Sequence, residues 1–255
     1  MLEVHQFPCL SDNYGYLLHD PDSGETACID TPDAEAYLRE AAAKGWQITQ
    51  IWNTHWHPDH AGGNEAIKAA TGCTVIASAA EADKTAGIDR AVGQDDVVKL
   101  GNWEAQVLDV GGHTNGHIAY HLPAAKIAFV GDAVFALGCG RMFEGTAPQF
   151  WDSLMRVKAL PPETLLYCAH EYTESNARFA LSVEPGNRAL QQRAAVVANL
   201  RKEGKMTCPT TIGEEIKTNP FLRCDSPEIR RNLKMESATD AEVFAELRTR
   251  KDNFK

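Results

Sequence analysis

The stretch that decides the fold is THWHPDHAGG, residues 54–63. Within six positions it holds four side chains that can bind a metal ion: His55, His57, Asp59 and His60. The apolar run at residues 48–53 has the composition of a buried strand, so these side chains follow directly on a strand end. Residues two apart in an extended chain point the same way, and Pro58 favours an extended conformation in the residue before it. His55 and His57 can therefore face one ion.

Asp59 and His60 can reach a second point nearby if the chain then turns into the loop that Gly62 and Gly63 predict. Imidazole nitrogen and carboxylate oxygen are ligands that suit zinc, iron or manganese. A histidine-rich surface loop is the alternative interpretation. Four ligands in six residues after a buried strand argue against that loop and favour a metal site.

Three further strand ends carry candidate ligands: His113 with His117, Asp132, and His170. Taken singly, each has an ordinary explanation, such as a turn cap, a helix cap or a buried hydrogen-bonded histidine. Binding and catalytic sites commonly form where the strands of a rigid scaffold end. The joint pattern therefore predicts one shared site.

The composition limits the classes of protein to consider. The chain has 255 residues, 44% of them hydrophobic, enough for one large domain or a domain with an appendage. A formal net charge of −10 disfavours nucleic acid and anionic membranes as partners. No apolar run approaches transmembrane length, and the first 19 residues lack signal-peptide features. Seven cysteines without a C-x-x-C pair indicate a reducing compartment, so we expect a cytoplasmic protein. We also expect a monomer.

Short strand-like runs alternate with helical patterns as far as about residue 170. We expect strands at residues 2–7, 14–19, 26–29, 48–53, 74–77, 97–100, 105–109, 119–122, 127–130 and 165–168. We expect helices at residues 33–44, 64–70 and 149–159. Strand hairpins mixed with crossover helices predict a layered α/β or α+β domain.

After residue 173 the strand signal fades and helix signals replace it. Residues 174–183 and 188–203 have helical patterns, the second with Asn187 as its N-cap. Two later helix starts are marked by Ser226 before a proline and by a capping box at Thr239. These signals predict a helical C-terminal subdomain.

The succession of metal-binding motifs resembles that of the metallo-β-lactamase superfamily. The motifs are H-x-H-x-D-H at residues 55–60, G-H-T-x-G-H at 112–117, a Gly-Asp pair at 131–132, and the late histidine at 170. The resemblance implies an α+β fold, an αββα sandwich with a two-metal site at one edge. We expect residues 1–172 to form this catalytic domain and residues 173–255 to form a helical substrate-binding domain.

Five further segments resemble a narrower group, the hydroxyacylglutathione hydrolases or glyoxalase II enzymes. They are GCGRMFEGTA at 138–147, CAHEYT at 168–173, VEPGN at 183–187, NPFLR at 219–223 and RTRKDNF at 248–254. With the metal motifs they span essentially the whole chain. The implied activity is hydrolysis of S-D-lactoylglutathione and related 2-hydroxyacylglutathione thioesters to glutathione and D-lactate or another 2-hydroxy acid. That reaction is the second step of methylglyoxal detoxification.

The resemblance also assigns the ligands of two divalent metal ions. One ion takes His55, His57 and His113, the other takes Asp59, His60 and His170, and Asp132 bridges both. Asp59 or Asp132 is implied to orient the attacking water, whereas His117 matches a histidine outside the ligand set. Zinc is the expected metal, with iron and manganese as alternatives.

Five residues are implied to bind the substrate: Arg141, Phe143, Tyr172, Arg248 and Lys251. Phe143 stands where some members have tyrosine, so a hydroxyl contact is lost there. Arg248 and Lys251 match basic residues that hold the glycine carboxylate of glutathione, and their spacing of three places them on one helix face. The alternative interpretation is that Arg248 and Lys251 lie at a solvent-exposed helix end, where positive charges interact favourably with the helix dipole.

The chain departs from the family pattern at Trp56 and Pro58, where histidine is common, and at Gly111, where proline is common. None of these changes removes a ligand, although Trp56 and Pro58 could alter metal preference. Cys168 lies two residues before His170, and we interpret it as a small buried apolar residue.

Three other functions belong to different classes. A glutathione-persulfide dioxygenase shares the fold and the H-x-H-x-D-H stretch but uses one iron and generally lacks this helical C-terminal domain. A nucleic-acid phosphodiesterase is disfavoured by the acidic charge balance. A non-catalytic binding module has little support, because every expected ligand is present. The sequence has no G-x-S-x-G motif, and metal-activated water requires no serine nucleophile.

Overall fold

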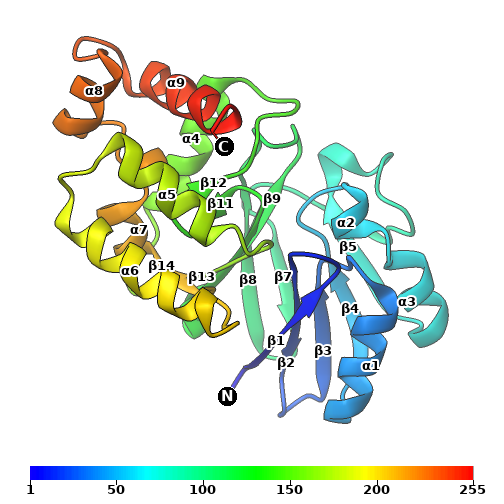
Figure 1. Ribbon diagram of the computed structural model, residues 1–255. Coiled ribbons are helices and arrows are strands. Elements are labelled where there is room, and N and C mark those ends of the chain that lie inside the picture. The colour runs from blue at the N-terminus through cyan, green and yellow to red at the C-terminus, as the bar shows by residue number, and fades with distance from the viewer. Residues whose placement is uncertain (255) are drawn as a thin grey trace. The chain divides into compact units, whose positions relative to one another are not determined.

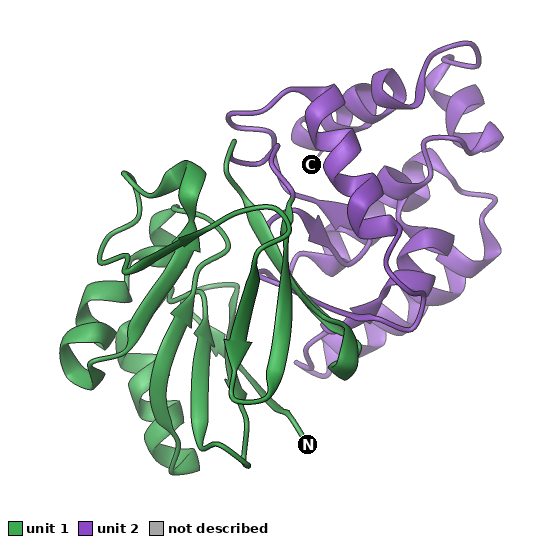
Figure 2. Ribbon diagram, turned by 180° about the vertical axis from the view of Figure 1, so that it is seen from behind, with its two compact units in different colours: residues 1–109, 115–131 green, residues 110–114, 132–255 purple. Residues whose placement is uncertain are grey.

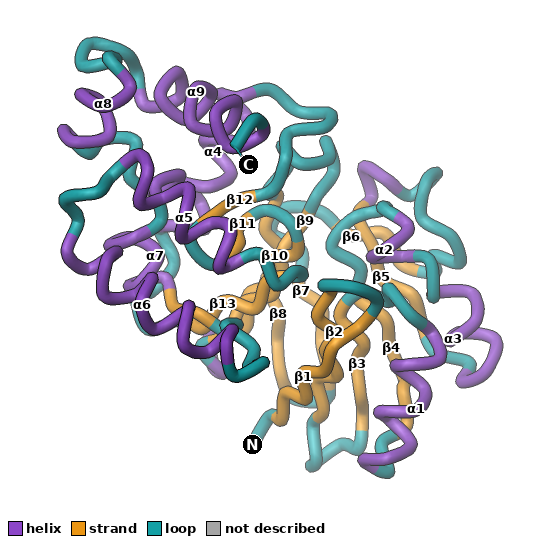
Figure 3. Tube along the Cα trace, viewed as in Figure 1, coloured by secondary structure: helices purple, strands orange, loops and turns teal. Residues whose placement is uncertain are grey.

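The computed structural model describes residues 1–254, and the chain packs into two compact units (Figure 2). Unit 1 contains residues 1–109 and 115–131, and unit 2 contains residues 110–114 and those from 132 onward. The strands are concentrated in unit 1, whereas unit 2 is mostly helical (Figure 3).

The first sheet of unit 1 has six strands that lie side by side in chain order. They are β1 (Glu3–Cys9), β2 (Asn13–His19), β3 (Glu25–Ile29), β4 (Gln47–Trp52), β5 (Thr74–Ser78) and β6 (Arg90–Val92). The first three pair antiparallel, and β3 to β6 pair parallel. Parallel neighbours need crossover connections, and α1 (Ala34–Lys44) and α3 (Asn64–Thr71) lie in the first two of them (Figure 1).

α1 illustrates how the local sequence sets the ends of an element. The Asp33 side chain accepts a hydrogen bond from the Ala36 amide at 3.1 Å and caps the first turn. Gly45 ends the helix with a φ of 70°, a conformation that favours glycine. The Tyr37 hydroxyl then donates to the carbonyl of Ile29 at 2.8 Å and joins the helix to β3. The helix predicted at residues 33–44 is confirmed.

The second sheet of unit 1 is antiparallel. Its strands are β7 (Val97–Leu100), β8 (Trp103–Asp109), β9 (Ile118–Leu122) and β10 (Ile127–Gly131). Aromatic rings from the two sheets of this unit meet, Tyr16 with Phe129 at 5.6 Å and Trp52 with Tyr120 at 5.3 Å between centroids. α1 and α3 pack buried side chains against the first sheet. The layers of unit 1 are therefore helices, first sheet and second sheet.

Unit 2 is built from helices and two short antiparallel strand pairs. The helices are α4 (Ala147–Lys158), α5 (Thr173–Val183), α6 (Arg188–Lys202), α7 (Ile212–Thr218), α8 (Pro227–Leu233) and α9 (Asp240–Asp252). The strand pairs are β11 (Val134–Phe135) with β12 (Gly138–Cys139), and β13 (Leu165–Cys168) with β14 (Thr210–Thr211). The helix caps predicted at Asn187, Ser226 and Thr239 are confirmed.

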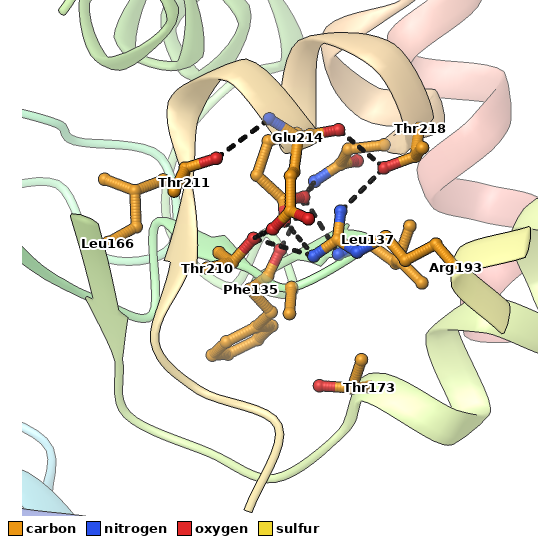
Figure 4. Close-up of polar contacts among 12 residues, drawn as sticks. Phe135, Leu137, Leu166, Thr173, Arg193, Thr210, Thr211, Glu214 and Thr218 are labelled. Atoms are coloured by element: carbon orange, nitrogen blue, oxygen red, sulfur yellow. Dashed lines mark hydrogen bonds and ion pairs between the residues drawn. The ribbon is translucent and has the colours of Figure 1, made fainter. Parts of the chain in front are cut away.

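A buried polar network fixes the turn between β11 and β12, and Figure 4 shows Arg193, Thr210 and Leu137 within it. The fully buried Glu215 forms an ion pair with Arg193 and accepts from the Thr210 hydroxyl at 2.7 Å. It also accepts from the Leu137 amide at 2.9 Å and from the Asn219 side chain at 2.9 Å. A buried carboxylate is tolerated only when its charge and hydrogen bonds are satisfied, so these partners hold one another in place.

The predicted strands and helices are all present, with ends that differ by at most two residues. Several short elements were missed, among them α2 (Pro58–Ala61), β6, α7 and the β11–β12 pair. They are too short for a hydrophobic period to show. Among the residues described, no helix is long and apolar enough to cross a membrane.

Candidate metal centre

The segment between β4 and α2 of unit 1 places His55 and His57. His57 has a φ of −54° and a ψ of 147°, the extended conformation expected before a proline. The Nε2 atom of His55 lies 3.0 Å from the Nδ1 atom of His57. The two imidazoles are therefore close enough to face a common point, as predicted for ligands of one ion.

Asp59 and His60 lie in α2, a four-residue helix that precedes the turn predicted at Gly62 and Gly63. The Nδ1 atom of His60 lies 2.9 Å from Oδ2 of Asp30. Because an ionised carboxylate can only accept, Nδ1 carries the proton and Nε2 keeps the lone pair that a metal needs. That Nε2 atom lies 3.6 Å from Oδ2 of Asp59.

Asp30 is a residue that the sequence analysis missed. It follows the end of β3, is buried, and also accepts from the amide and hydroxyl of Thr54 at 2.7 and 2.9 Å. Its φ of 55° is uncommon for a residue other than glycine. One carboxylate thus orients His60 and the backbone just before His55. A polar residue at the end of an apolar strand was the available signal, the same one that singled out Asp132.

Glu81 is a second residue that was missed. It is buried, and its two oxygens accept from the amides of Trp56 at 3.2 Å and Gly116 at 2.9 Å. A Cβ atom at Gly116 would lie 2.6 Å from Cγ of Glu81, so only glycine permits this approach. The carboxylate therefore joins the His55–His57 segment to the residues before β9. Its partners are 25 and 35 positions away, so no local pattern pointed to it.

His113, Asp132 and His170 come together in unit 2, and all three are buried. Nε2 of His113 lies 3.5 Å from Oδ2 of Asp132, and Nε2 of His170 lies 3.4 Å from Oδ1 of the same carboxylate. Each oxygen of Asp132 thus faces a different imidazole, which is the arrangement that a bridging carboxylate needs.

The candidate ligands come from both units: His55, His57, Asp59 and His60 belong to unit 1, and His113, Asp132 and His170 belong to unit 2. Two ligand atoms about 2.1 Å from a tetrahedral ion would be roughly 3.4 Å apart, which is close to the observed separations. Imidazole nitrogens and carboxylate oxygens in this spacing fit divalent metal ions.

Aromatic and basic side chains predicted to bind substrate accompany the ligands of unit 2. The ring of Tyr172 stacks on His170 with centroids 4.8 Å apart, and the ring of Phe143 meets His113 edge-on at 5.2 Å. Phe143 is 62% exposed despite this contact. Arg141 is exposed, and its Nε atom lies 3.8 Å from the Asp252 carboxylate. Their side chains are thus accessible to a ligand.

Arg248 and Lys251 differ in their surroundings on α9. Arg248 is 4% exposed and donates to backbone carbonyls. The alternative interpretation, that it lies at a solvated helix end, is therefore wrong for this residue. Lys251 is partly buried, and its ammonium lies 2.9 Å from the Ser175 hydroxyl. Burial, with the nearby charges of Arg248, Arg178 and Arg141, lowers the pKa of Lys251 to about 8. Arg141 and Arg248 both lie beside the Asp252 carboxylate, at 3.8 and 3.0 Å. The nearby Arg178 was not predicted.

Three of the remaining sequence interpretations concern residues near the ligands in the chain or in space. His117 is fully buried and stacks on His55 with centroids 4.6 Å apart. It is absent from the groups of candidate ligands. Cys168 is buried, with its Sγ 3.8 Å from that of Cys208, and the prediction of a buried cysteine is confirmed. Trp56 lies under the ammonium of Lys84, 5.0 Å from the ring centroid.

Models of known protein families match both parts of the chain. A family model described as "Metallo-beta-lactamase superfamily" matches residues 15–170, and one described as "Hydroxyacylglutathione hydrolase C-terminus" matches residues 171–254. A hydroxyacylglutathione hydrolase of Erythrobacter litoralis is 63% identical over 254 residues, covering 100% of each chain. One of Hyphomonas neptunium is 58% identical over 255 residues, covering 100% of this chain and 99% of its own.

Solved structures show the same architecture. The structure of ETHE1 from Myxococcus xanthus has a TM-score of 0.67 at 27% identity and covers 99% of this chain and 100% of its own. A B3 metallo-β-lactamase, BLEG-1, has a TM-score of 0.68 at 21% identity and covers 87% of this chain and 100% of its own. The chain therefore has the metallo-β-lactamase fold with a helical C-terminal region, and the fold predicted from the sequence is confirmed.

Proposed function

The chain belongs to the hydroxyacylglutathione hydrolase family of the metallo-β-lactamase superfamily, and from this premise we infer that it is a thioester hydrolase. It hydrolyses S-D-lactoylglutathione and related 2-hydroxyacylglutathione thioesters to glutathione and the 2-hydroxy acid. The observation that carries this conclusion is the likeness to hydroxyacylglutathione hydrolases over the full length of the chain.

We propose that the candidate ligands hold two divalent ions. His55, His57 and His113 would hold one, Asp59, His60 and His170 the other, and Asp132 would bridge them. When bound, such ions lower the pKa of water toward about 7 and polarise a carbonyl oxygen. The proton positions support this assignment, because Asp30 fixes the tautomer of His60. The carbonyl of Arg141 likewise accepts from Nδ1 of His113 at 2.7 Å.

The protein's own side chains would bind and orient the substrate. We propose that Asp59 and Asp132 orient the attacking water as hydrogen-bond acceptors beside the ligands. Tyr172 and Phe143 offer aromatic surface next to His170 and His113, where the acyl-thioester portion can lie. We propose that Arg141, Arg248 and Lys251 bind the carboxylates of glutathione. We also propose that residues 1–172 form the catalytic domain and residues 173–255 the substrate-binding domain.

Several finer properties are proposals as well. The ligand set suits zinc, which we propose as the resident ion, with iron or manganese as the alternatives that the same ligands accept. We propose a cytoplasmic monomer that acts on a small molecule and binds no nucleic acid, consistent with a net charge of −10.

Two measurements test the proposal. Purified protein should hydrolyse S-D-lactoylglutathione with release of a free thiol and should contain about two transition-metal ions per chain. Glutathione persulfide should give no oxygen uptake. Oxygen uptake without thioester hydrolysis, together with one tightly bound iron, would replace the hydrolase with the dioxygenase alternative.

A further inference from the structure

Arg248 donates hydrogen bonds to the chain segment that follows β12. Its Nη1 atom lies 2.8 Å from the carbonyl oxygen of Cys139 and 3.3 Å from that of Gly140. The guanidinium also lies 5.1 Å from the ring centroid of Phe221 and forms an ion pair with Asp252 at 3.0 Å. A charged donor held on several sides fixes the carbonyls that it contacts.

The next carbonyl in this segment sets the protonation of a metal ligand. The oxygen of Arg141 lies 2.7 Å from Nδ1 of His113. A carbonyl oxygen can only accept, so Nδ1 carries the proton and Nε2 keeps the lone pair that faces Asp132 at 3.5 Å. The orientation of the imidazole therefore depends on the position of the Arg141 carbonyl.

Residues 139–141 pack tightly against Asp132 and His113. A Cβ atom at Gly140 would lie 2.0 Å from the carbonyl oxygen of Asp132 and 3.0 Å from Nδ1 of His113. Only glycine can pass so close to both residues. A displacement of residues 139–141 would therefore move the hydrogen-bond acceptor of His113.

The preceding turn is already fixed by the network of Figure 4. Glu215 accepts from the Leu137 amide at 2.9 Å, and the Asn219 side chain donates to the carbonyl of Gly138 at 2.9 Å. These bonds hold residues 137 and 138, and the Arg248 contacts continue the support to residues 139 and 140. The support thus ends one residue before the carbonyl that His113 uses.

We propose that Arg248 is a positioning residue for the metal ligand His113, acting through the backbone of residues 139–141. This role is additional to any contact with the substrate, and it rests on the proposed metal centre. It makes α9 of the C-terminal region part of the support of the metal site. The proposal separates Arg248 from Lys251, whose ammonium contacts Ser175 instead.

The test compares metal retention in variants of the metal-loaded protein. Arg248→Ala removes the side chain, Arg248→Met keeps the stem over Phe221 without donors, and Arg248→Lys keeps one charged donor. Lys251→Ala removes a cation of the same cluster, and Arg250→Ala removes an exposed arginine of the same helix. The readouts are the rate of metal loss to a chelator and the absorption spectrum of the cobalt-substituted protein, both without substrate.

We expect Arg248→Ala and Arg248→Met to lose metal about 10- to 100-fold faster and to shift the cobalt spectrum. Arg248→Lys should restore part of the retention, because a point charge can still hold one carbonyl. Lys251→Ala and Arg250→Ala should retain metal at the wild-type rate. If Arg248→Ala does not fold, Arg248→Met and Arg248→Lys carry the comparison.

A kinetic comparison with two thioesters separates positioning from carboxylate binding. Arg248→Met should lower kcat both for the glutathione thioester and for an analogue without the glycine carboxylate. Unchanged metal loss and an unchanged cobalt spectrum in the Arg248 variants, with only KM raised, would overturn the proposal. Failure of the wild type to hydrolyse thioesters would overturn the proposed function instead, since the metal-loss measurement uses no substrate.

Discussion

At the scale of single residues, the two oxygens of Asp132 face different imidazoles, at 3.5 Å from His113 and 3.4 Å from His170. If this carboxylate bridges two ions, an amide of the same shape cannot neutralise them. We expect Asp132→Asn to lower metal content and to reduce kcat by orders of magnitude while the chain still folds. Metal analysis, steady-state kinetics and circular dichroism test this. Asp152→Asn, an exposed carboxylate on α4, is the control, and full metal content with normal turnover would remove Asp132 from the site.

Glu81 gives the second prediction at this scale. Its carboxylate is the acceptor for the Trp56 and Gly116 amides, and an unsatisfied buried donor costs about 1–3 kcal/mol. Glu81→Ala should therefore lower the free energy of unfolding by roughly 2–5 kcal/mol. It should also speed metal loss, because Trp56 lies between two ligands. Urea denaturation and a chelator assay measure the two effects, and the exposed neighbour Asp83→Ala should change neither.

The sequence could single out the candidate ligands but not the side chains that orient them. His55, His57 and Asp132 stand at strand ends, where spacing along one strand or loop determines which way they point. Asp30, Glu81 and Arg248 act on residues 24 to 109 positions away. Such contacts depend on how the elements pack, which no local period encodes. The sequence did predict Arg248 as a substrate ligand, but its burial against Cys139 was visible only in the structure.

At the scale of elements, the longer strands and helices were predictable because hydrophobic periods and caps recur within one segment. α2 was not predicted, since four residues are too few to show a helical period. The helix nevertheless follows from the sequence in retrospect, because Pro58 is favoured at the first helical position. α7 was missed although Thr211 caps it and accepts from the Glu214 amide at 3.1 Å.

The cluster carried by α9 and its neighbours predicts a pH dependence. The ammonium of Lys251 is the form that attracts a carboxylate, and its pKa is lowered to about 8 by burial and by nearby arginines. Because the charge is lost as pH rises through this pKa, kcat/KM for the glutathione thioester should fall above about pH 8. Below about pH 7, where Lys251 stays charged, this residue should cause no change in kcat/KM with pH.

Lys251→Arg is the matched variant for this prediction, because arginine keeps its charge throughout the range. Its kcat/KM profile should lack the decline above pH 8. The substrate and its spontaneous hydrolysis are the same in both assays, so they cannot cause a difference between the two profiles. The same inflection in the lysine and arginine proteins would assign the decline to another group.

At the scale of the whole molecule, the apolar clusters and the proposed metal site consist of different residues. One apolar cluster of unit 1 lies between α1, α3 and the first sheet, and a cluster in unit 2 includes Leu137 and Leu190. The proposed ligands belong to neither cluster. The protein should therefore keep its fold without metal, unlike small domains that need the ion to form a core.

The last prediction is that metal removal weakens the fold without unfolding it. Ions that bind only the folded state add stability of about RT ln(1 + [L]/Kd), about 4 kcal/mol at 1,000 times Kd. Removal also leaves the buried carboxylate of Asp132 between His113 and His170 without a cation. Chelator-treated protein should therefore melt several degrees lower while its far-ultraviolet circular dichroism at 25 °C is retained. Returning zinc should restore the melting temperature, and Asp132→Asn should respond less to zinc than the wild type. Loss of secondary structure on chelation would instead show that the ions are needed to form the fold, and an unchanged melting temperature would show that they do not bind at these buried side chains.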